Sequence, residues 1–533
     1  MNRRPSRWLI LMLVLLSLVA LTHCGRPKQV ASQETPFSTL ARWVPGDTEY
    51  ALFFDLKPDG KAGDHWARIH QRLMANPTGQ QALDGLDHQF RVAEYGLDAA
   101  TVGPVVNWYN YRTEYVIAQL SDEQAAQDAM RQHFANVTWQ EEEYEGHTLY
   151  HGKNPDSWQR RERLAWTIRD GCLFLVARYE MEALEALQEL LNLGQEDSLA
   201  ALPAWQTLRD RLPEAPLGLM FINNAVQASQ RPPTSGDTSL NTALNQQLVA
   251  MAWAAVPEEQ GLRVEMAGTI APQPDTFPKL QALLSLPAVD PTAWPGLPAD
   301  TMVALIGHDF SLFWPLIADM FSLDALTQLG DAVGLDLEAD LASAEGPLSS
   351  DFALAITPPL PGQPISQGLP AGQLLILGPG VSPARMAEVQ AAMEGRGAVF
   401  GPGAVEGVPL QVQVGTELTG YAIAYGFDDN ILLFGSSPAV IGQGIAAQRE
   451  GNGLAANATY HAALTVLPDA PTFVVYVNTQ LLTNTARANM TEEQYQNSEE
   501  VIGLEAFEAI ALGVQLKSDG TIDGVTYLFV GHD

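Results

Sequence analysis

The chain has little cysteine and little positive charge. Its 533 residues include two cysteines, Cys24 and Cys172, too few for the disulfide framework that stabilises many small secreted domains. Lysine and arginine total 29 against 62 acidic residues, which gives a formal net charge of -33. Nucleic-acid binding requires clustered basic residues, and the one short basic cluster, Arg160 to Arg163, is interrupted by Glu162. A nucleic-acid partner is therefore excluded.

The chain also lacks an apolar segment long enough to cross a membrane as a helix. Arginines precede an apolar run of 14 residues, Trp8 to Leu21, whereas a spanning helix needs about 20. A basic start followed by a short apolar core is typical of a signal peptide, which we predict at residues 1–23. The alternatives are an uncleaved signal anchor and plain secretion.

Cys24 stands where the apolar run gives way to a polar segment. The tetrapeptide Leu21-Thr22-His23-Cys24 resembles the bacterial lipobox, in which the cysteine becomes the acylated first residue, although His23 replaces the usual small residue. We predict lipidation at Cys24, a lipid-proximal linker at residues 24–36, and an extracytoplasmic protein held to a membrane by its lipid. With Cys24 acylated, no disulfide can form, and the apolar surroundings of Cys172 favour a structural role.

The sequence repeats itself once. Pro45-Gly46-Asp47-Thr48 returns as Pro298-Ala299-Asp300-Thr301, 253 residues later. Further matches follow in the same order: Gly96-Leu97-Asp98 with Gly334-Leu335-Asp336, Glu145-Gly146 with Glu406-Gly407, Ser198-Leu199-Ala200 with Gly453-Leu454-Ala455, and Asn223 with Asn478. A repeat this long indicates a duplicated domain, because solenoid units run to a few tens of residues. We predict tandem homologous domains at residues 37–270 and 297–533, joined by a proline-rich linker at 271–296.

Within each half, short strands alternate with amphipathic helices. Residues 105–111 and 113–120 are predicted to form a hairpin, and a capped helix follows to about residue 133. Leucines at helical spacing predict another helix over residues 180–192. Further strands are expected at residues 50–56, 139–144, 146–150, 164–176 and 217–222, with a final hairpin around 258–261. Antiparallel neighbours joined by short turns predict an α+β fold, each domain a mostly antiparallel sheet with interspersed helices.

The candidate catalytic motifs each depart from their pattern. Gly378-Pro379-Gly380 lies between a strand and a helix, but Pro383 stands where a dinucleotide fingerprint needs glycine or alanine. His147 and His151 are predicted on one strand, where their Cα atoms would be about 13 Å apart, too far to share a metal ion without a third element. We therefore predict no catalytic residue, no metal site and no cofactor, and a protein that is not an enzyme.

Aromatic side chains supply the candidate binding residues. Trp108, Tyr109, Tyr111 and Tyr115 cluster across the predicted hairpin and its turn. Exposed aromatics of this kind stack on sugars or on partner proteins. The alternative, which we favour, is that alternate positions fill the two sides of a sheet.

The repeated motifs carry a family resemblance. The doubled Pro-x-Asp-Thr strand openings, the Gly-Leu-Asp steps, the Glu-Gly-x-x-Leu turns and the Ser/Gly-Leu-Ala segments resemble an uncharacterised family of bacterial envelope lipoproteins. That family is known only as a domain of unknown function, number thirty-three fifty-two. The resemblance covers about residues 37–533. It implies an extracytoplasmic location and supplies no catalytic residues.

The sequence as a whole favours a lipid-anchored, non-catalytic binding or carrier protein. Its expected partners are the membrane, through the lipid, and a glycan or a protein. One alternative is an envelope scaffold whose acidic surface engages a basic protein partner. The other is a hydrolase without a recognisable motif, since acids can be brought together by the fold alone.

Overall fold

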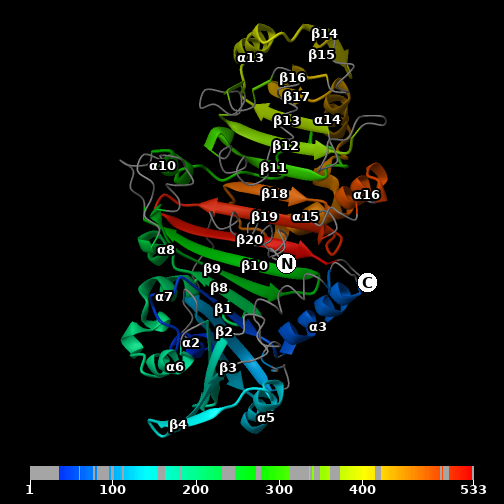
Figure 1. The fold of residues 1–533 in the computed structure, drawn as a ribbon. Helices are drawn as coiled ribbons and strands as arrows, with labels where there is room; N and C mark the ends of the chain where they lie inside the picture. The colour runs from blue at the N-terminus through cyan, green and yellow to red at the C-terminus, as the bar shows by residue number, and fades with distance from the viewer. Residues whose placement is uncertain are drawn as a thin grey trace. The chain divides into compact units, whose positions relative to one another are not determined.

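The fold is seen in a computed structural model, shown as a ribbon in Figure 1. It describes residues 35–58, 60–75, 79–80, 95, 97, 101–110, 113–153, 162–179, 182–230, 246–271, 278–312, 335–336, 339–340, 349–359, 373–414, 422–492, 495 and 503–530. The chain divides into two compact units. The first unit contains Gly25–Asp237 and Leu244–Ala271, and the second unit contains Pro272–Asp533.

The first unit is built on an antiparallel sheet with the order β4-β5-β6-β7-β3-β2-β1-β8-β9-β10. Its strands are β1 (Tyr50–Asp55), β2 (Val102–Asn110), β3 (Thr113–Leu120), β4 (Gln140–Tyr144), β5 (His147–Lys153), β6 (Glu162–Arg169), β7 (Cys172–Tyr179), β8 (Gly218–Ile222), β9 (Leu248–Pro257) and β10 (Gly261–Ile270). Most are rich in β-branched and aromatic residues, which pack well on a pleated surface.

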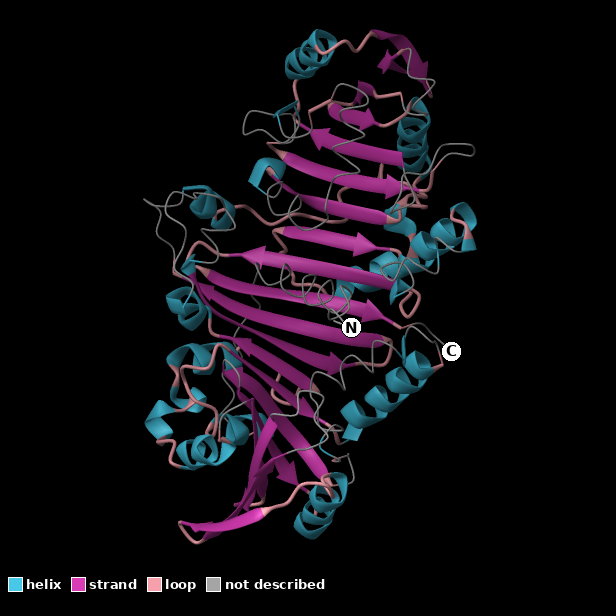
Figure 2. Ribbon diagram, viewed as in Figure 1, coloured by secondary structure: helices cyan, strands magenta, loops and turns pink. Residues whose placement is uncertain are grey.

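Helices cover both faces of this sheet (Figure 2). They are α2 (Pro36–Ala41), α3 (Gly60–Met74), α5 (Glu123–His133), α6 (Ala183–Leu191), α7 (Pro203–Arg209) and α8 (Asn224–Gln230). On what we call the α6 face, α2, α6 and α7 pack with Phe53, Trp108 and Phe174 into one core. On the α5 face, α5 packs with Val105, Val116 and other side chains into a second core. Since successive strand residues point to opposite faces, the central strands β2, β3 and β7 contribute to both cores.

The second unit has a sheet with the order β14-β15-β16-β17-β13-β12-β11-β18-β19-β20, again antiparallel. Its strands are β11 (Val303–His308), β12 (Asp351–Thr357), β13 (Gln373–Pro379), β14 (Phe400–Val405), β15 (Val408–Gln413), β16 (Ala424–Asp428), β17 (Ile431–Gly435), β18 (Phe473–Val477), β19 (Ala509–Leu516) and β20 (Thr521–Phe529). Its helices include α10 (Pro278–Leu284), α13 (Pro383–Gly395), α14 (Pro438–Glu450), α15 (Ala458–Val466) and α16 (Thr479–Asn489).

The two units share their strand order, and their hairpin turns share a backbone conformation. Each turn has two central residues at positive φ, as type I′ turns require. The turns are Glu145-Gly146 (φ 50° and 82°) and Asp170-Gly171 (51° and 72°) in the first unit, and Glu406-Gly407 (48° and 79°) and Asp429-Asn430 (46° and 66°) in the second. Because the right-handed twist of paired strands favours this turn type, the local sequence fixes the same hairpin in both units.

The α+β class and the antiparallel sheet are confirmed, whereas one predicted strand is wrong. Residues 164–176 form two strands, β6 and β7, separated by the Asp170-Gly171 turn. The mostly apolar residues on either side outweighed the polar step Arg169-Asp170-Gly171 in the prediction, because strands buried on both faces do not alternate.

The proline-rich segment predicted as a linker packs onto the second unit. The Val289 backbone N–H donates to the Pro471 carbonyl (2.7 Å), and the Tyr460 hydroxyl donates to the Pro291 carbonyl (2.9 Å). Val289 is also buried in the core beneath α14 and α15. The end of this segment is therefore anchored to the second unit by backbone hydrogen bonds and apolar packing.

Candidate functional site

The structure divides the predicted aromatic cluster between two faces of the first sheet. Trp108 is 1% exposed and lies in the α6-face core. Its ring stacks on that of Tyr115, with centroids 4.9 Å apart and planes 4° from parallel, because the two residues are directly paired across β2 and β3. Trp108 is thus a core residue and does not form an exposed binding platform. Tyr111 lies outside the described residues.

Tyr109 points to the opposite, α5 face, where it joins polar residues that the sequence analysis did not single out. Its ring contacts Tyr50 on β1, with centroids 6.2 Å apart, and it is paired directly with Glu114 on β3. Asn107, two residues before Tyr109 and so on the same face, donates from Nδ2 to Glu114 Oε1 at 3.5 Å. We call Tyr50, Asn107, Tyr109 and Glu114 the polar cluster.

Burial within the polar cluster is uneven. Asn107 is 0% and Glu114 4% exposed, whereas Tyr50 and Tyr109 are half-buried. The cluster therefore has a buried carboxylate and carboxamide beside phenol rings that reach solvent. Burying a carboxylate in a sheet is unfavourable unless other groups compensate its charge.

The second unit shows that the fold does not require these polar groups. In the first unit a row across the sheet runs Ile222, Tyr50, Tyr109, Glu114. The same positions of the second unit carry Val477, Val303, Ile356 and Leu374, and the position of Asn107 carries Leu354. Every polar side chain of the cluster is therefore replaced by an apolar one in the matching unit.

The electrostatic field at the polar cluster is negative. Burial, with smaller contributions from the nearby carboxylates Glu114 and Glu49, raises the pKa of Tyr50 to about 12. A phenol with so high a pKa stays neutral near pH 7 and keeps its hydroxyl proton.

The signal that could have found the cluster is present in the repeat. Glu114 is a charged residue directly before the apolar run of β3, and its counterpart in the second half is Leu374. Matching the halves residue by residue along this strand would have singled out Glu114. The sequence does not reveal that Tyr50 and Asn107 are neighbours of Glu114, because that requires knowing that β1 pairs with β2 and not with another strand.

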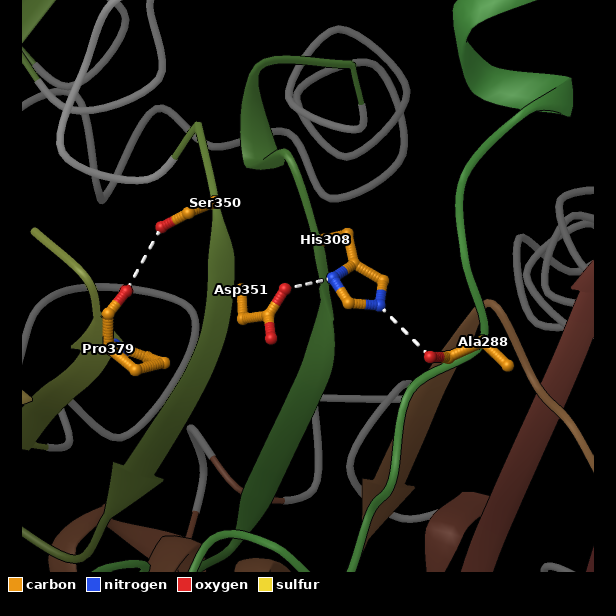
Figure 3. Close-up of polar contacts among 5 residues, drawn as sticks. All are labelled: Ala288, His308, Ser350, Asp351 and Pro379. Carbon is orange, nitrogen blue, oxygen red and sulfur yellow. Dashed lines mark hydrogen bonds and ion pairs between the residues drawn. The ribbon is translucent and has the colours of Figure 1, made fainter.

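A histidine–aspartate pair in the second unit has the appearance of part of a catalytic triad (Figure 3). His308 Nδ1 contacts Asp351 Oδ1, and His308 Nε2 faces the Ala288 carbonyl at 3.1 Å. The neighbouring Ser350 hydroxyl donates instead to the Pro379 carbonyl at 3.2 Å. In a triad the second histidine nitrogen would meet the serine hydroxyl. Here it meets backbone, so the pair fastens the segment around Ala288 to the sheet.

The remaining sequence candidates fall in structural positions. Cys172 is buried, and burial, with a smaller contribution from Asp170, raises the pKa of its thiol to about 11, so it is a poor nucleophile at neutral pH. His147 and His151 both lie on β5, as predicted. Within the described part of the chain, no group of three or more potential ligands is placed to hold a metal ion. Cys24 lies outside the described residues.

One structural observation bears on whether the chain crosses a membrane. Among the residues that the structure describes, none of the helices combines the length and apolar character needed to cross a bilayer.

The comparison with protein families gives the chain its identity. The model of the family described as "Protein of unknown function (DUF3352)" matches residues 111–377, about half of the chain. The chain belongs to this family. The matched span is narrower than the expected 37–533, and it runs from residue 111, just before β3 in the first unit, to residue 377 in β13 of the second. The DUF3352 span therefore includes Glu114 but begins after Tyr50, Asn107 and Tyr109.

Solved structures similar to part of this DUF3352 protein include crystal forms of TP0453. Crystal form III is 14% identical, covers 49% of this chain and 89% of that chain, and has a TM-score of 0.25. Crystal form I is 13% identical, covers 48% and 84%, and has the same TM-score. No curated protein matches the chain.

Proposed function

We propose that this DUF3352 protein is a lipid-anchored, extracytoplasmic and non-catalytic binding or carrier protein, with its ligand site at the polar cluster of the first unit. The observation that carries the proposal is the buried Asn107–Glu114 pair, which the matching positions of the second unit replace by leucines. Polar groups that the scaffold can do without, placed beside half-buried aromatic rings, are typical of a ligand site.

We also propose that the two units arose by tandem duplication. The shared strand order supports this, and so do local contacts that recur at matching positions of the two units. The Leu199 N–H donates to the Val44 carbonyl, as the Leu454 N–H does to the Leu297 carbonyl. Asn223 caps α8 through Val226 N–H, as Asn478 caps α16 through Leu481 N–H. Duplication would leave one copy free to acquire polar residues while the other kept an apolar sheet.

The site can be tested by giving it the side chains of the second unit. The double variant Asn107→Leu/Glu114→Leu should fold, because replacing a buried polar pair by apolar residues is often neutral or stabilising. We expect the wild-type protein, purified gently from its own host, to show in native mass spectrometry an extra mass that denaturation releases. The double variant should lack that mass.

The matched control is Ile117→Leu. Ile117 lies on the same strand as Glu114 but on the opposite face, and leucine is the residue type at the matching position of the second unit, Leu377. The Ile117→Leu variant should retain the extra mass. A wild-type protein without any releasable mass would contradict the carrier function and favour the scaffold with a basic partner. Equal mass in the double variant would place the site elsewhere.

The lipid anchor is tested separately. Because acyl chains carry the protein into the hydrocarbon phase, Cys24→Ala should move it from the detergent-rich to the aqueous phase and remove the acyl mass. Cys172→Ala, which changes the other cysteine, should leave partitioning unchanged. Continued partitioning of Cys24→Ala into detergent would show that the anchor is not a lipid on Cys24 and would favour an uncleaved signal anchor.

A further inference from the structure

The outer strand of the first sheet is β4, Gln140–Tyr144 (Figure 1). Within the described part of the chain, β4 pairs with β5 alone. We propose that the free edge of β4 is a docking surface for a partner protein, which adds an extended, lysine- or arginine-rich segment to the sheet. This surface is separate from the polar cluster on β1, β2 and β3, so it does not depend on the ligand site proposed above.

The turn after β4 determines which backbone groups face outward. Tyr144 and His147 flank the two-residue turn Glu145-Gly146, and residues that flank such a turn exchange hydrogen bonds with each other. Pairing then alternates along the strand, so the N–H and C=O groups of Glu141 and Glu143 point away from β5. The free edge of β4 thus presents the alternating donors and acceptors that another strand requires.

The matching edge of the second unit is blocked against strand addition. Counting back from the turn after each edge strand aligns Pro402 in β14 with Glu141 in β4. Proline has no N–H group, so at this outward-facing position it interrupts the row of donors that an added strand would use. Natural proteins protect sheet edges in this way. The fold therefore accepts a blocked edge, whereas the first unit has an open one.

The side chains along this edge carry negative charge. Four glutamates are exposed: Glu141, Glu142, Glu143 and Glu145. Among the described residues, their side-chain contacts are with neutral groups, since Gln188 Nε2 donates to Glu142 Oε1 at 3.0 Å and Thr148 Oγ1 donates to Glu143 Oε1 at 2.9 Å. These contacts do not neutralise the carboxylates, so a partner with positive charge would meet a negative edge.

Charge complementarity selects the partner. Like charges directly opposite each other destabilise a pair of strands, and opposite charges stabilise it. A second copy of β4 is therefore disfavoured at this edge. Successive residues of a strand point to opposite faces, so basic residues at alternate positions of an added strand can lie beside Glu141 and Glu143 on one face of the sheet.

The test uses three blocked heptapeptides with valine at alternate positions. The first has lysine at the other positions, the second has glutamate there, and the third is the lysine peptide with every backbone amide N-methylated, which removes the donors and keeps the charge. Isothermal titration of the full-length protein near pH 7 should show binding of the first peptide only. Hydrogen exchange followed by mass spectrometry should show slower exchange in β4 when that peptide is bound.

Variants of the edge separate backbone pairing from charge. Glu141→Pro gives β4 the proline of β14 and should bind the lysine peptide at least about tenfold more weakly than Glu141→Gln, which loses the same charge but keeps its N–H group. Glu141→Gln/Glu143→Gln should weaken binding about tenfold relative to the wild type. The matched control, Glu259→Gln/Glu450→Gln, removes two other exposed carboxylates and should leave binding unchanged, with circular dichroism confirming that each variant is folded.

The contrary results are equally defined. Absence of binding by the lysine peptide would overturn the proposal. Equal binding of the N-methylated peptide, or equal binding to Glu141→Pro and Glu141→Gln, would also overturn it, because attraction of charges would then suffice without strand addition. A wild-type dimer that Glu141→Pro dissociates would assign the edge to a second copy of this chain and not to a basic partner. None of these results depends on the releasable mass that tests the polar cluster.

Discussion

Replacing Trp108 by alanine is expected to lower the free energy of unfolding of the first unit by about 3–5 kcal/mol. Trp108 is 1% exposed, and its removal would leave a cavity beside Tyr115 and cost the stacking of the two rings. A loss of this size is a large share of the 5–15 kcal/mol that stabilises a typical domain. Hydrogen exchange of β2 and β3, followed by mass spectrometry, would measure it locally.

The matched control is Tyr109→Ala on the adjacent, half-buried position. It should destabilise the unit much less than Trp108→Ala, because its ring is partly in water already. Trp108→Ala as stable as Tyr109→Ala would contradict the core position of Trp108. This result also bears on glycan binding, since loss of retention on a glycan resin by a Trp108 variant would report unfolding and not recognition.

Tyr476 in the second unit and Phe221 in the first unit stand at matching positions. Replacing each by the other residue type should stabilise the second unit and destabilise the first. Tyr476 in β18 is 0% exposed, and its hydroxyl has no hydrogen-bond partner among the described residues. Phe221 occupies the matching place in β8, and each ring meets an aromatic neighbour edge-on, Trp205 in one unit and Tyr460 in the other. An unsatisfied buried hydroxyl costs about 1–3 kcal/mol. We therefore expect Tyr476→Phe to stabilise the second unit and Phe221→Tyr to destabilise the first by that amount.

The pH dependence of Tyr476→Phe provides an internal check. Burial raises the pKa of Tyr476 from 10.0 to about 12, so the folded state holds this proton more tightly than the unfolded chain. The wild type therefore loses stability as the pH rises from 10 toward 12, and the advantage of Tyr476→Phe should grow over that interval. Denaturant unfolding at stepped pH measures it. A wild type more stable than Tyr476→Phe would mean that the hydroxyl is hydrogen-bonded.

Local signals in the sequence were sufficient for most individual elements. The hairpin of β2 and β3, the helix after Asp122 and the strand β8 follow from alternation, capping and turn residues, which act over a few positions. The Glu-Gly turns were visible for the same reason, because only certain residues tolerate positive φ. The Asp170-Gly171 turn was missed because the segments on either side of Arg169-Asp170-Gly171 are mostly apolar.

The candidate site depended on pairings that local patterns do not contain. Alternation already implies that Trp108 and Tyr109 point to opposite faces, but it does not say which face is covered. The structure shows that α2, α6 and α7 cover the face on which Trp108 lies. Glu114 likewise became a buried partner of Asn107 only because β3 lies between β2 and β7.

The sequence by itself determined the repeat, the turn chemistry and the strand and helix segments, because each depends on residues close together in the chain. Only the tertiary structure decided that Trp108 is core and that Tyr50, Asn107, Tyr109 and Glu114 share one face. Strand neighbours such as β1 with β8, or β3 with β7, join residues far apart in sequence. Their pairing is selected by the burial of whole sheet faces, a collective property that no short segment encodes.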